Sequence, residues 1–151
     1  MPNAISIIKR DHRAVEKDYK TYKRAKDKDQ KRRIAERIFD ALDAHAKMEE
    51  EVFYPAVTEA GGPELQKMIV EALEEHGEMK HLVARFRAPN AEERAGMGMR
   101  IDELLAGVMH HVKEEEKSLL PKSARALGKA RITALGERME PMSPSAKLPK
   151  P

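Results

Sequence analysis

A pattern of histidine, glutamate and proline occurs twice in the chain, and it constrains the fold more than any other feature. In each copy a glutamate follows the histidine by four residues and a proline follows it by ten. The copies are His45, Glu49 and Pro55, and then His111, Glu115 and Pro121. Upstream of each copy stands another histidine preceded by an acid, as Asp11-His12 and as Glu75-His76. The copies are offset by 66 residues at the first-named histidines and by 64 at the upstream ones, which indicates a duplicated helical hairpin.

Apolar side chains recur at every third or fourth residue along most of the chain, which is the spacing of one helical face. Four long helices are expected over 5–22, 34–56, 65–83 and 101–119, with Pro63 in the first turn of the third. Turns or breaks are expected at 25–30, 61–62 and 88–90, where Asn90 is a candidate cap. No segment shows the alternation of a strand. The sequence therefore predicts an all-α bundle over 1–122, a short helical extension over 123–140 and a proline-rich, disordered tail over 141–151.

The repeated histidines and glutamates lie on the apolar stripes of these helices. The four histidines, His12, His45, His76 and His111, stand where Ile, Leu or Val would continue each stripe. A residue four positions after another lies within about 40° of it around a helix, so Glu49 and Glu115 also point inward. Polar groups left unpaired in a core would cost several kcal/mol each. One inward histidine is more often a satisfied core residue than a ligand, but this set favours a site for transition-metal ions.

Composition excludes several other classes of protein. The chain has no cysteine, so disulfides and thiolate ligands are excluded and a metal would be held by nitrogen and oxygen atoms. No apolar run approaches the roughly 18 residues that span a bilayer, and the start lacks a signal peptide's basic and apolar regions, so a cytoplasmic location is expected. The basic stretch 23–37 is interrupted by acids and lacks aromatic residues, which argues against nucleic-acid binding. A monomer or weak homodimer with no membrane partner is expected.

These residues resemble the hemerythrin-like, or HHE cation-binding, domain family. The resemblance runs from His12 to Pro121 and includes the Glu-Glu after each histidine of the repeat and the downstream proline. It implies an up-and-down antiparallel four-helix bundle around a non-haem di-iron centre with an oxo or hydroxo bridge. It also implies imidazole ligands and bridging carboxylates, which would be His12, His45, His76, His111, Glu49 and Glu115. The same ligands accept manganese or zinc, so neither metal is excluded.

Several residues near this pattern leave alternatives open. Oxygen-carrying members of the family place a fifth histidine where this chain has Lys80, whose counterpart in the first half of the repeat is Glu16. These two residues form either a pair beside the metals or an ordinary charge pair. His81 and His110 are out of phase with the inward stripe, although His110 has the spacing of the oxygen carriers' last helix; the repeat favours His111. Tyr19 lies two turns from His12 and is either near the site or an ordinary core residue.

The resemblance implies a protein that handles oxygen species (O2, peroxide or NO) or iron, in sensing, protection or storage rather than bulk oxygen transport. One alternative is a peroxide-consuming di-iron catalase or peroxidase, with Glu16, Lys80 or Tyr19 handling protons. Another is a metal-gated interaction module whose C-terminal helix and tail contact a partner. A purely structural bundle is the remaining alternative, and it predicts no loss of metal on substitution of His45 or Glu115.

Overall fold

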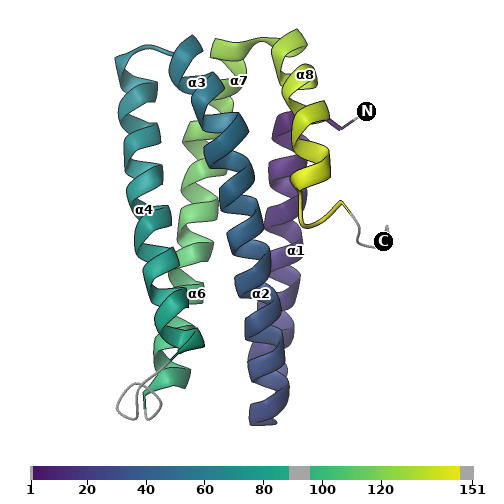
Figure 1. The fold of residues 1–151 in the computed structure, drawn as a ribbon, viewed down its shortest axis with the longest axis vertical. Helices are drawn as coiled ribbons and strands as arrows, with labels where there is room; N and C mark the ends of the chain where they lie inside the picture. The colour runs from purple at the N-terminus through teal and green to yellow at the C-terminus, as the bar shows by residue number, and fades with distance from the viewer. Residues whose placement is uncertain (1, 89–95, 147–151) are drawn as a thin grey trace.

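The computed structural model describes residues 2–88 and 96–146, and nearly all of them are helical. Four long helices run side by side and alternate in direction (Figure 1). They are α1 (Ala4–Arg24), α2 (Lys28–Met48), α4 (Pro63–Arg87) and α6 (Met97–Glu114). No strand occurs within the described residues. The up-and-down antiparallel four-helix bundle is therefore confirmed. The expected break at 89–90, with its candidate cap Asn90, lies outside the described residues.

Local chemistry fixes where the helices begin. Asn3 and Ser6 form a reciprocal capping box at the start of α1, in which each side chain accepts from the other's backbone N–H. The Asp27 side chain accepts from the backbone N–H of Gln30 and caps α2. Pro63 occupies the first turn of α4, where its missing N–H has no intrahelical partner to lose. These caps set the register that points the site residues inward.

Two of the four long helical segments of the bundle, here called rods, contain a π-helical turn. The second rod continues from α2 through η1 (Glu49–Phe53) into α3 (Tyr54–Ala60), and the fourth continues from α6 through η2 (Glu115–Leu119) into α7 (Leu120–Leu127). In each turn a backbone N–H bonds the carbonyl five residues earlier, from Tyr54 to Glu49 and from Leu120 to Glu115. Each turn begins at the glutamate of the repeat and ends just before its proline. Such turns often occur at functional sites, and these place both glutamates at a local change of helical phase.

The apolar core has two parts along the bundle axis. One cluster, with Ile8, Met48, Phe53 and Leu119 among its members, lies toward the end where α3 and α7 sit. The other, with Val15, Phe39, Val83 and Leu105 among its members, lies toward the opposite end. Along each helical segment at least one predicted site residue falls in sequence between the members of one cluster and those of the other, namely His12, His45, His76 and Glu115. A polar layer therefore separates the two apolar clusters.

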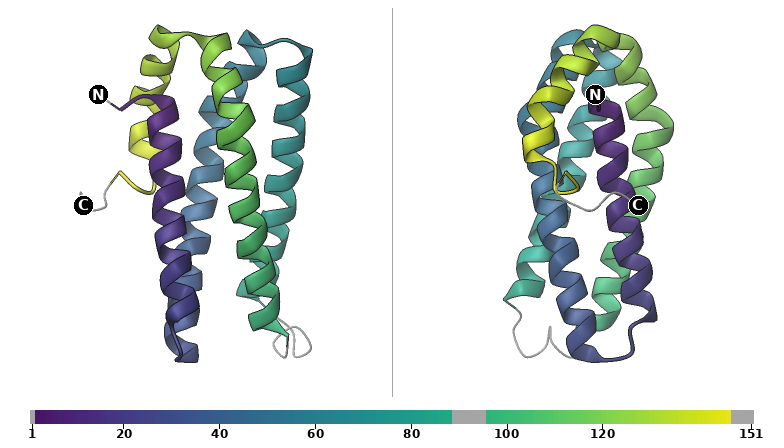
Figure 2. Two further views of the ribbon diagram at one scale, coloured as in Figure 1. Left: turned by 180° about the vertical axis from the view of Figure 1, so that it is seen from behind. Right: turned by 90° about the vertical axis from the view of Figure 1, so that its right-hand side faces the viewer.

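The C-terminal part differs from the expected boundaries. The fourth rod continues through α7 to Leu127, so the expected boundary at 122/123 falls inside a helix. Gly128 ends α7 with φ of 80°, a backbone conformation that glycine adopts without strain. The chain then folds back as α8 (Lys129–Met139), which lies along the N-terminal half of α1 (Figure 2). The buried side chains of α8 are Ile132, Leu135 and Met139. The helix is therefore part of the core and not a separate extension of the bundle.

The expectation of disorder from residue 141 onward is wrong for residues 141–146. A 3-10 turn, η3 (Glu140–Met142), follows α8 directly, and Ser143 and Ser145 are each only 5% exposed. Both serines contact Asp11 on α1, and this buried acceptor orders a segment whose composition resembles that of a disordered tail. Residues 147–151 lie outside the described part of the chain. None of the helices described is long and apolar enough to cross a membrane.

Candidate metal centre

All six residues predicted as ligands converge on the polar layer between the two apolar clusters. The histidines come from the four long helices, and the glutamates come from the two π turns. The residues in chain order are His12, His45, Glu49, His76, His111 and Glu115. Glu49 is fully buried and Glu115 is 3% exposed. The His111 side chain, at 20%, is the most exposed of the four imidazoles.

The four imidazoles form two pairs, and each of the two glutamates lies close to one imidazole of each pair. The ring centroids of His12 and His45 are 5.0 Å apart, and those of His76 and His111 are 5.6 Å apart. Glu49 Oε1 lies 3.2 Å from His45 Nε2 and 3.4 Å from His76 Nε2. The Glu49 carboxylate is therefore close to one imidazole of the first pair and to one of the second.

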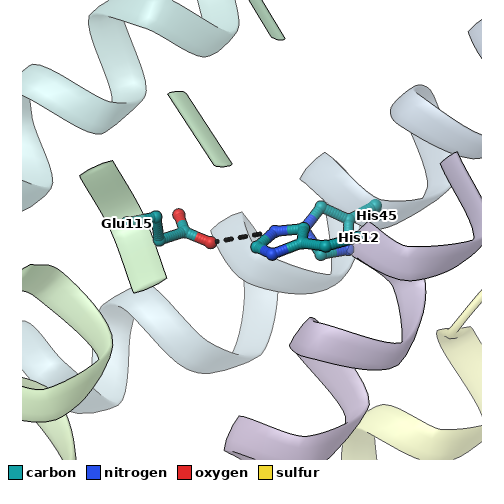
Figure 3. Close-up of side chains that lie close together, drawn as sticks. All are labelled: His12, His45 and Glu115. Carbon is teal, nitrogen blue, oxygen red and sulfur yellow. Dashed lines mark ion pairs between the residues drawn. The ribbon is translucent and has the colours of Figure 1, made fainter. Parts of the chain in front are cut away.

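Glu115 has the equivalent position on the other side of the layer. Its Oε1 lies 3.3 Å from His12 Nε2, and its Oε2 lies 3.5 Å from His111 Nε2. One nitrogen or oxygen atom each from His12, His45 and Glu115 lie within 4.8 Å of one another, a separation that one cation can span (Figure 3). Each carboxylate therefore touches one imidazole of each pair, as the duplicated sequence implies.

Each imidazole also bonds a second carboxylate through its Nδ1 atom. We call these four the outer carboxylates. His12 faces Glu116 at 2.6 Å, His45 faces Asp11 at 2.8 Å, His76 faces Glu50 at 2.9 Å and His111 faces Glu75 at 3.1 Å. An ionised carboxylate only accepts, so each Nδ1 carries a hydrogen and Nε2 is left as the atom able to bind a cation. This is the orientation that metal-binding histidines adopt in proteins.

The outer carboxylates were not predicted, although the sequence carries a signal for them. Each follows or precedes a predicted ligand by one residue: Asp11 and Glu75 precede a histidine, and Glu50 and Glu116 follow a glutamate. These acids recur at matching places in both copies of the repeat. Adjacent residues on one helix diverge by about 100°, so an acid beside a ligand cannot contact it and instead reaches a histidine on a neighbouring helix.

Several buried polar atoms of the layer have no hydrogen-bond partner among the residues that the structure describes. They are His45 Nε2, Glu49 Oε1 and Oε2, His111 Nε2 and Glu115 Oε1. A buried polar atom without a partner costs roughly 1–3 kcal/mol, and more if it is charged. These atoms face one another at the centre of the layer and are nitrogen and oxygen donors of the kind that iron, manganese and zinc accept. The donor set therefore fits metal cations.

The buried charges shift the pKa values of the layer in opposite directions. Burial alone would lower the pKa of His45, but the carboxylates of Glu49 and Asp11 outweigh it and raise that pKa well above its usual value. Burial likewise opposes protonation of His111, but Glu115 outweighs it and raises the pKa to about 9. Burial would raise the pKa of Glu115, whereas His111 holds it well below its usual range. A cation that binds these nitrogens must displace protons from them.

Tyr54 belongs to the layer and was missed from the sequence. Its hydroxyl donates to Glu115 Oε2 at 2.8 Å and lies 3.5 Å from His76 Nε2. Burial and the charges of Glu49 and Glu115 raise the pKa of Tyr54 well above its usual value, so the phenol keeps its proton. The matching position in the second copy is Leu120. The tyrosine therefore breaks the two-fold likeness of the site, and this difference between the copies was the available signal.

The residues whose part in the site the sequence did not decide lie outside the layer. Tyr19 is half-buried and packs against the core cluster away from the site, with the Lys23 ammonium 4.6 Å from its ring centroid. The pairing of Glu16 with Lys80 is wrong: Glu16 binds Arg13, and Lys80 binds the outer carboxylate Glu50 at 2.8 Å.

His81 and His110 are both exposed, and the structure places His111, not His110, in the layer. The two exposed histidines are one residue out of phase with the inward stripe, which turns them away from the bundle axis.

A cavity of about 620 Å³ opens between α4 and α6 and reaches His76 and His111. Apolar residues line part of it, namely Met79, Leu82, Phe86, Leu104, Gly107 and Val108. Charged residues also line it, namely Glu75, Glu78, Arg85, Arg100 and Glu103. His110, the exposed neighbour of His111, also lines it. The imidazole pair of His76 and His111 therefore faces a space that a small molecule can enter.

Comparison with known proteins finds one family and relatives from two organisms. Residues 3–123 match the family model described as the hemerythrin HHE cation binding domain. An uncharacterized hemerythrin-like protein of Schizosaccharomyces pombe is 30% identical over 121 residues, which cover 80% of this chain and 59% of that protein. A DNA nickase of Nostoc is 32% identical over 119 residues, which cover 78% of this chain and 32% of that protein. The chain thus spans less than two thirds of either relative. No solved structure matches it significantly.

Proposed function

The chain belongs to the hemerythrin family of HHE cation-binding domains and is a metal-binding, hemerythrin-like protein, and we propose that its polar layer binds two iron ions that handle a small oxygen-derived ligand. Iron held by imidazoles and carboxylates supplies redox chemistry and an open position for O2, peroxide or NO. The observation that carries this proposal is the placement of Glu49 and Glu115, each of which reaches one imidazole of both pairs. A carboxylate in that position would be able to hold two ions at once.

The protein's own groups prepare the centre for such a ligand. The outer carboxylates fix the four imidazole rings with Nε2 inward, and the two apolar clusters exclude bulk water from above and below the layer. The Tyr54 hydroxyl oxygen lies 2.8 Å from Glu115 Oε2, and Tyr54 is the one buried phenol in the described part of this layer. The Tyr54 hydroxyl, which keeps its proton, would be placed to donate a hydrogen bond to a small oxygen-derived ligand in the layer.

The absence of a fifth imidazole at position 80 supports a role other than bulk oxygen transport. Lys80 is 43% exposed and its ammonium is held by Glu50, so it reaches His76 only through that outer carboxylate. We propose sensing, protection or iron storage as the role of the centre. Turnover of peroxide is the second candidate, and the position of the Tyr54 hydroxyl favours it.

Anaerobic titration of the metal-free protein with ferrous iron tests the proposal. We expect saturation at two irons per chain, followed by a near-ultraviolet band on admission of air. Oxygen evolution after addition of peroxide would separate turnover from simple binding. Saturation at fewer than two irons, or no change in the spectrum in air, would contradict the di-iron assignment.

The cavity between α4 and α6 predicts how a ligand reaches the centre. Gly107 lines this cavity, and a Cβ at that position meets no other atom within 4 Å. Gly107→Leu should therefore fit without strain, narrow the cavity and slow binding of azide to the iron-loaded protein several-fold. Stopped-flow absorbance measures this rate.

Gly77→Leu is the matched control for this experiment. Gly77 is also an exposed helical glycine with open space around its Cβ, but it does not line the cavity. Its substitution should leave the azide rate unchanged. Equal rates in both variants and the unsubstituted protein would show that the ligand enters by another route.

A further inference from the structure

We propose that residues 140–146, here called the C-terminal segment, position His45 at the metal centre by anchoring its outer carboxylate, Asp11. This inference rests on the proposed two-metal site and adds to it a part of the chain that lies beyond the matched family region, residues 3–123. The segment would act on the metal through Asp11 and His45 without touching it.

Three donors from the C-terminal segment converge on one oxygen of Asp11. The Ser143 hydroxyl donates to Asp11 Oδ1 at 2.6 Å, the Ser145 hydroxyl donates to the same atom, and the Ser145 backbone N–H donates at 3.2 Å. The other oxygen, Oδ2, accepts from His45 Nδ1 at 2.8 Å. Asp11 is 1% exposed, so these contacts replace water as its solvation. The carboxylate is held in one orientation, with Oδ2 toward the imidazole.

Arg10 fixes the direction in which the serine hydroxyls donate. Its guanidinium donates to Ser145 Oγ at 2.8 Å and to Ser143 Oγ at 3.1 Å, and it pairs with Glu140 at 2.9 Å. A hydroxyl that accepts from arginine keeps its own hydrogen for another acceptor. Both serine hydrogens are therefore directed to Asp11, and the Glu140 pair holds the segment on α1.

Within residues 2–88 and 96–146, the matching outer carboxylate in the second copy has no such anchor. Glu75 bonds His111 Nδ1 at 3.1 Å, but its side chain is 53% exposed. The C-terminal segment thus acts on one imidazole pair only. Because outer partners of a metal-binding histidine set its orientation and basicity, the ion at His12 and His45 should be bound more tightly than the ion at His76 and His111.

The test is a titration of the full-length, metal-free protein with Co²⁺, read by its visible absorption bands and by calorimetry. We expect two binding steps of unequal affinity. Ser143→Ala with Ser145→Ala should weaken the tighter step about tenfold, the lower end of what loss of an outer partner costs, and leave the other step unchanged. Each serine is also replaced alone, so that a double variant that fails to fold does not decide the matter.

Three further variants separate positioning from a loss of stability. Ser123→Ala removes a fully buried serine whose hydroxyl has no partner in the described part of the chain, and it should change neither step. Glu75→Gln should weaken the other step. Asp11→Asn should weaken the tighter step, and the serine substitutions should have no further effect in that background, because they act through Asp11.

The outcomes distinguish this inference from the proposed function. Failure of the unsubstituted protein to bind two ions would overturn both. Two normal binding steps in the serine variants, or equal weakening of both steps, would overturn the positioning role alone. An additive effect of the serine and Asp11 substitutions would also contradict it.

Discussion

Glu115→Ala should lose most of both metal ions, whereas His12→Ala should lose mainly one. Glu115 lies 3.3 Å from His12 Nε2 and 3.5 Å from His111 Nε2, so its carboxylate serves both imidazole pairs, while His12 serves one. The same contrast is expected for Glu49→Ala. Metal bound only to the folded state stabilises it by about 2.7 kcal/mol when free metal is a hundredfold above Kd, so the glutamate variants should also show the larger fall in Tm. Elemental analysis after dialysis measures the content.

His110→Ala is the matched control, because His110 is exposed and adjoins His111 without entering the layer. It should keep both ions. If Glu115→Ala instead retained one full equivalent, the carboxylate would belong to a single ion, and the bridging role would be wrong.

Gly136→Ala should destabilise the protein by roughly 1–3 kcal/mol, the usual cost of an extra methyl group in a filled space. Gly136 on α8 packs against the start of α1, and a Cβ there would lie 2.7 Å from Pro2 O and 2.8 Å from Asn3 Cα. Both neighbours are backbone atoms, and Asn3 caps α1, so neither can move aside without disturbing the cap. The free energy of unfolding of the metal-free protein in urea measures the effect.

Gly77→Ala should change the free energy of unfolding in the opposite direction. Its Cβ meets nothing within 4 Å, so the substitution should stabilise the protein by up to about 1 kcal/mol through helix propensity alone. Stabilisation by Gly136→Ala as well would show that α8 does not pack on α1 as described.

The repeat and the helical periodicity predicted the bundle and the inward position of all six candidate ligands, because both depend on spacing along a single helix. Tyr54 and the outer carboxylates depend on contacts between helices. Asp11, for example, lies 34 residues from His45 and reaches it across the α1–α2 interface. No spacing rule within one helix connects those two residues. The phase of Tyr19 did not decide between a place near the site and a place in the core, because phase gives the face of a helix and not the height along the bundle; the structure packs Tyr19 against the core cluster away from the site.

The C-terminal segment was predicted least well, because composition is a poor guide when a buried partner is present. Three prolines and two serines among residues 141–149 are typical of disorder. Order there depends on Asp11 and Arg10, which lie more than 130 residues earlier in the chain. The expected boundary at 122/123 lies within α7, and it is the turn at Gly128, not the end of the repeat, that separates α7 from α8.

X-ray absorption at the iron edge of the loaded protein tests the central claim most directly, because it measures the distance between metals. If Glu49 and Glu115 join two ions, the spectrum should contain an iron neighbour at about 3.5–4 Å or somewhat less, beside a shell of nitrogen and oxygen atoms. A spectrum with only the nitrogen and oxygen shell, and no metal neighbour, would contradict a two-metal centre in this layer.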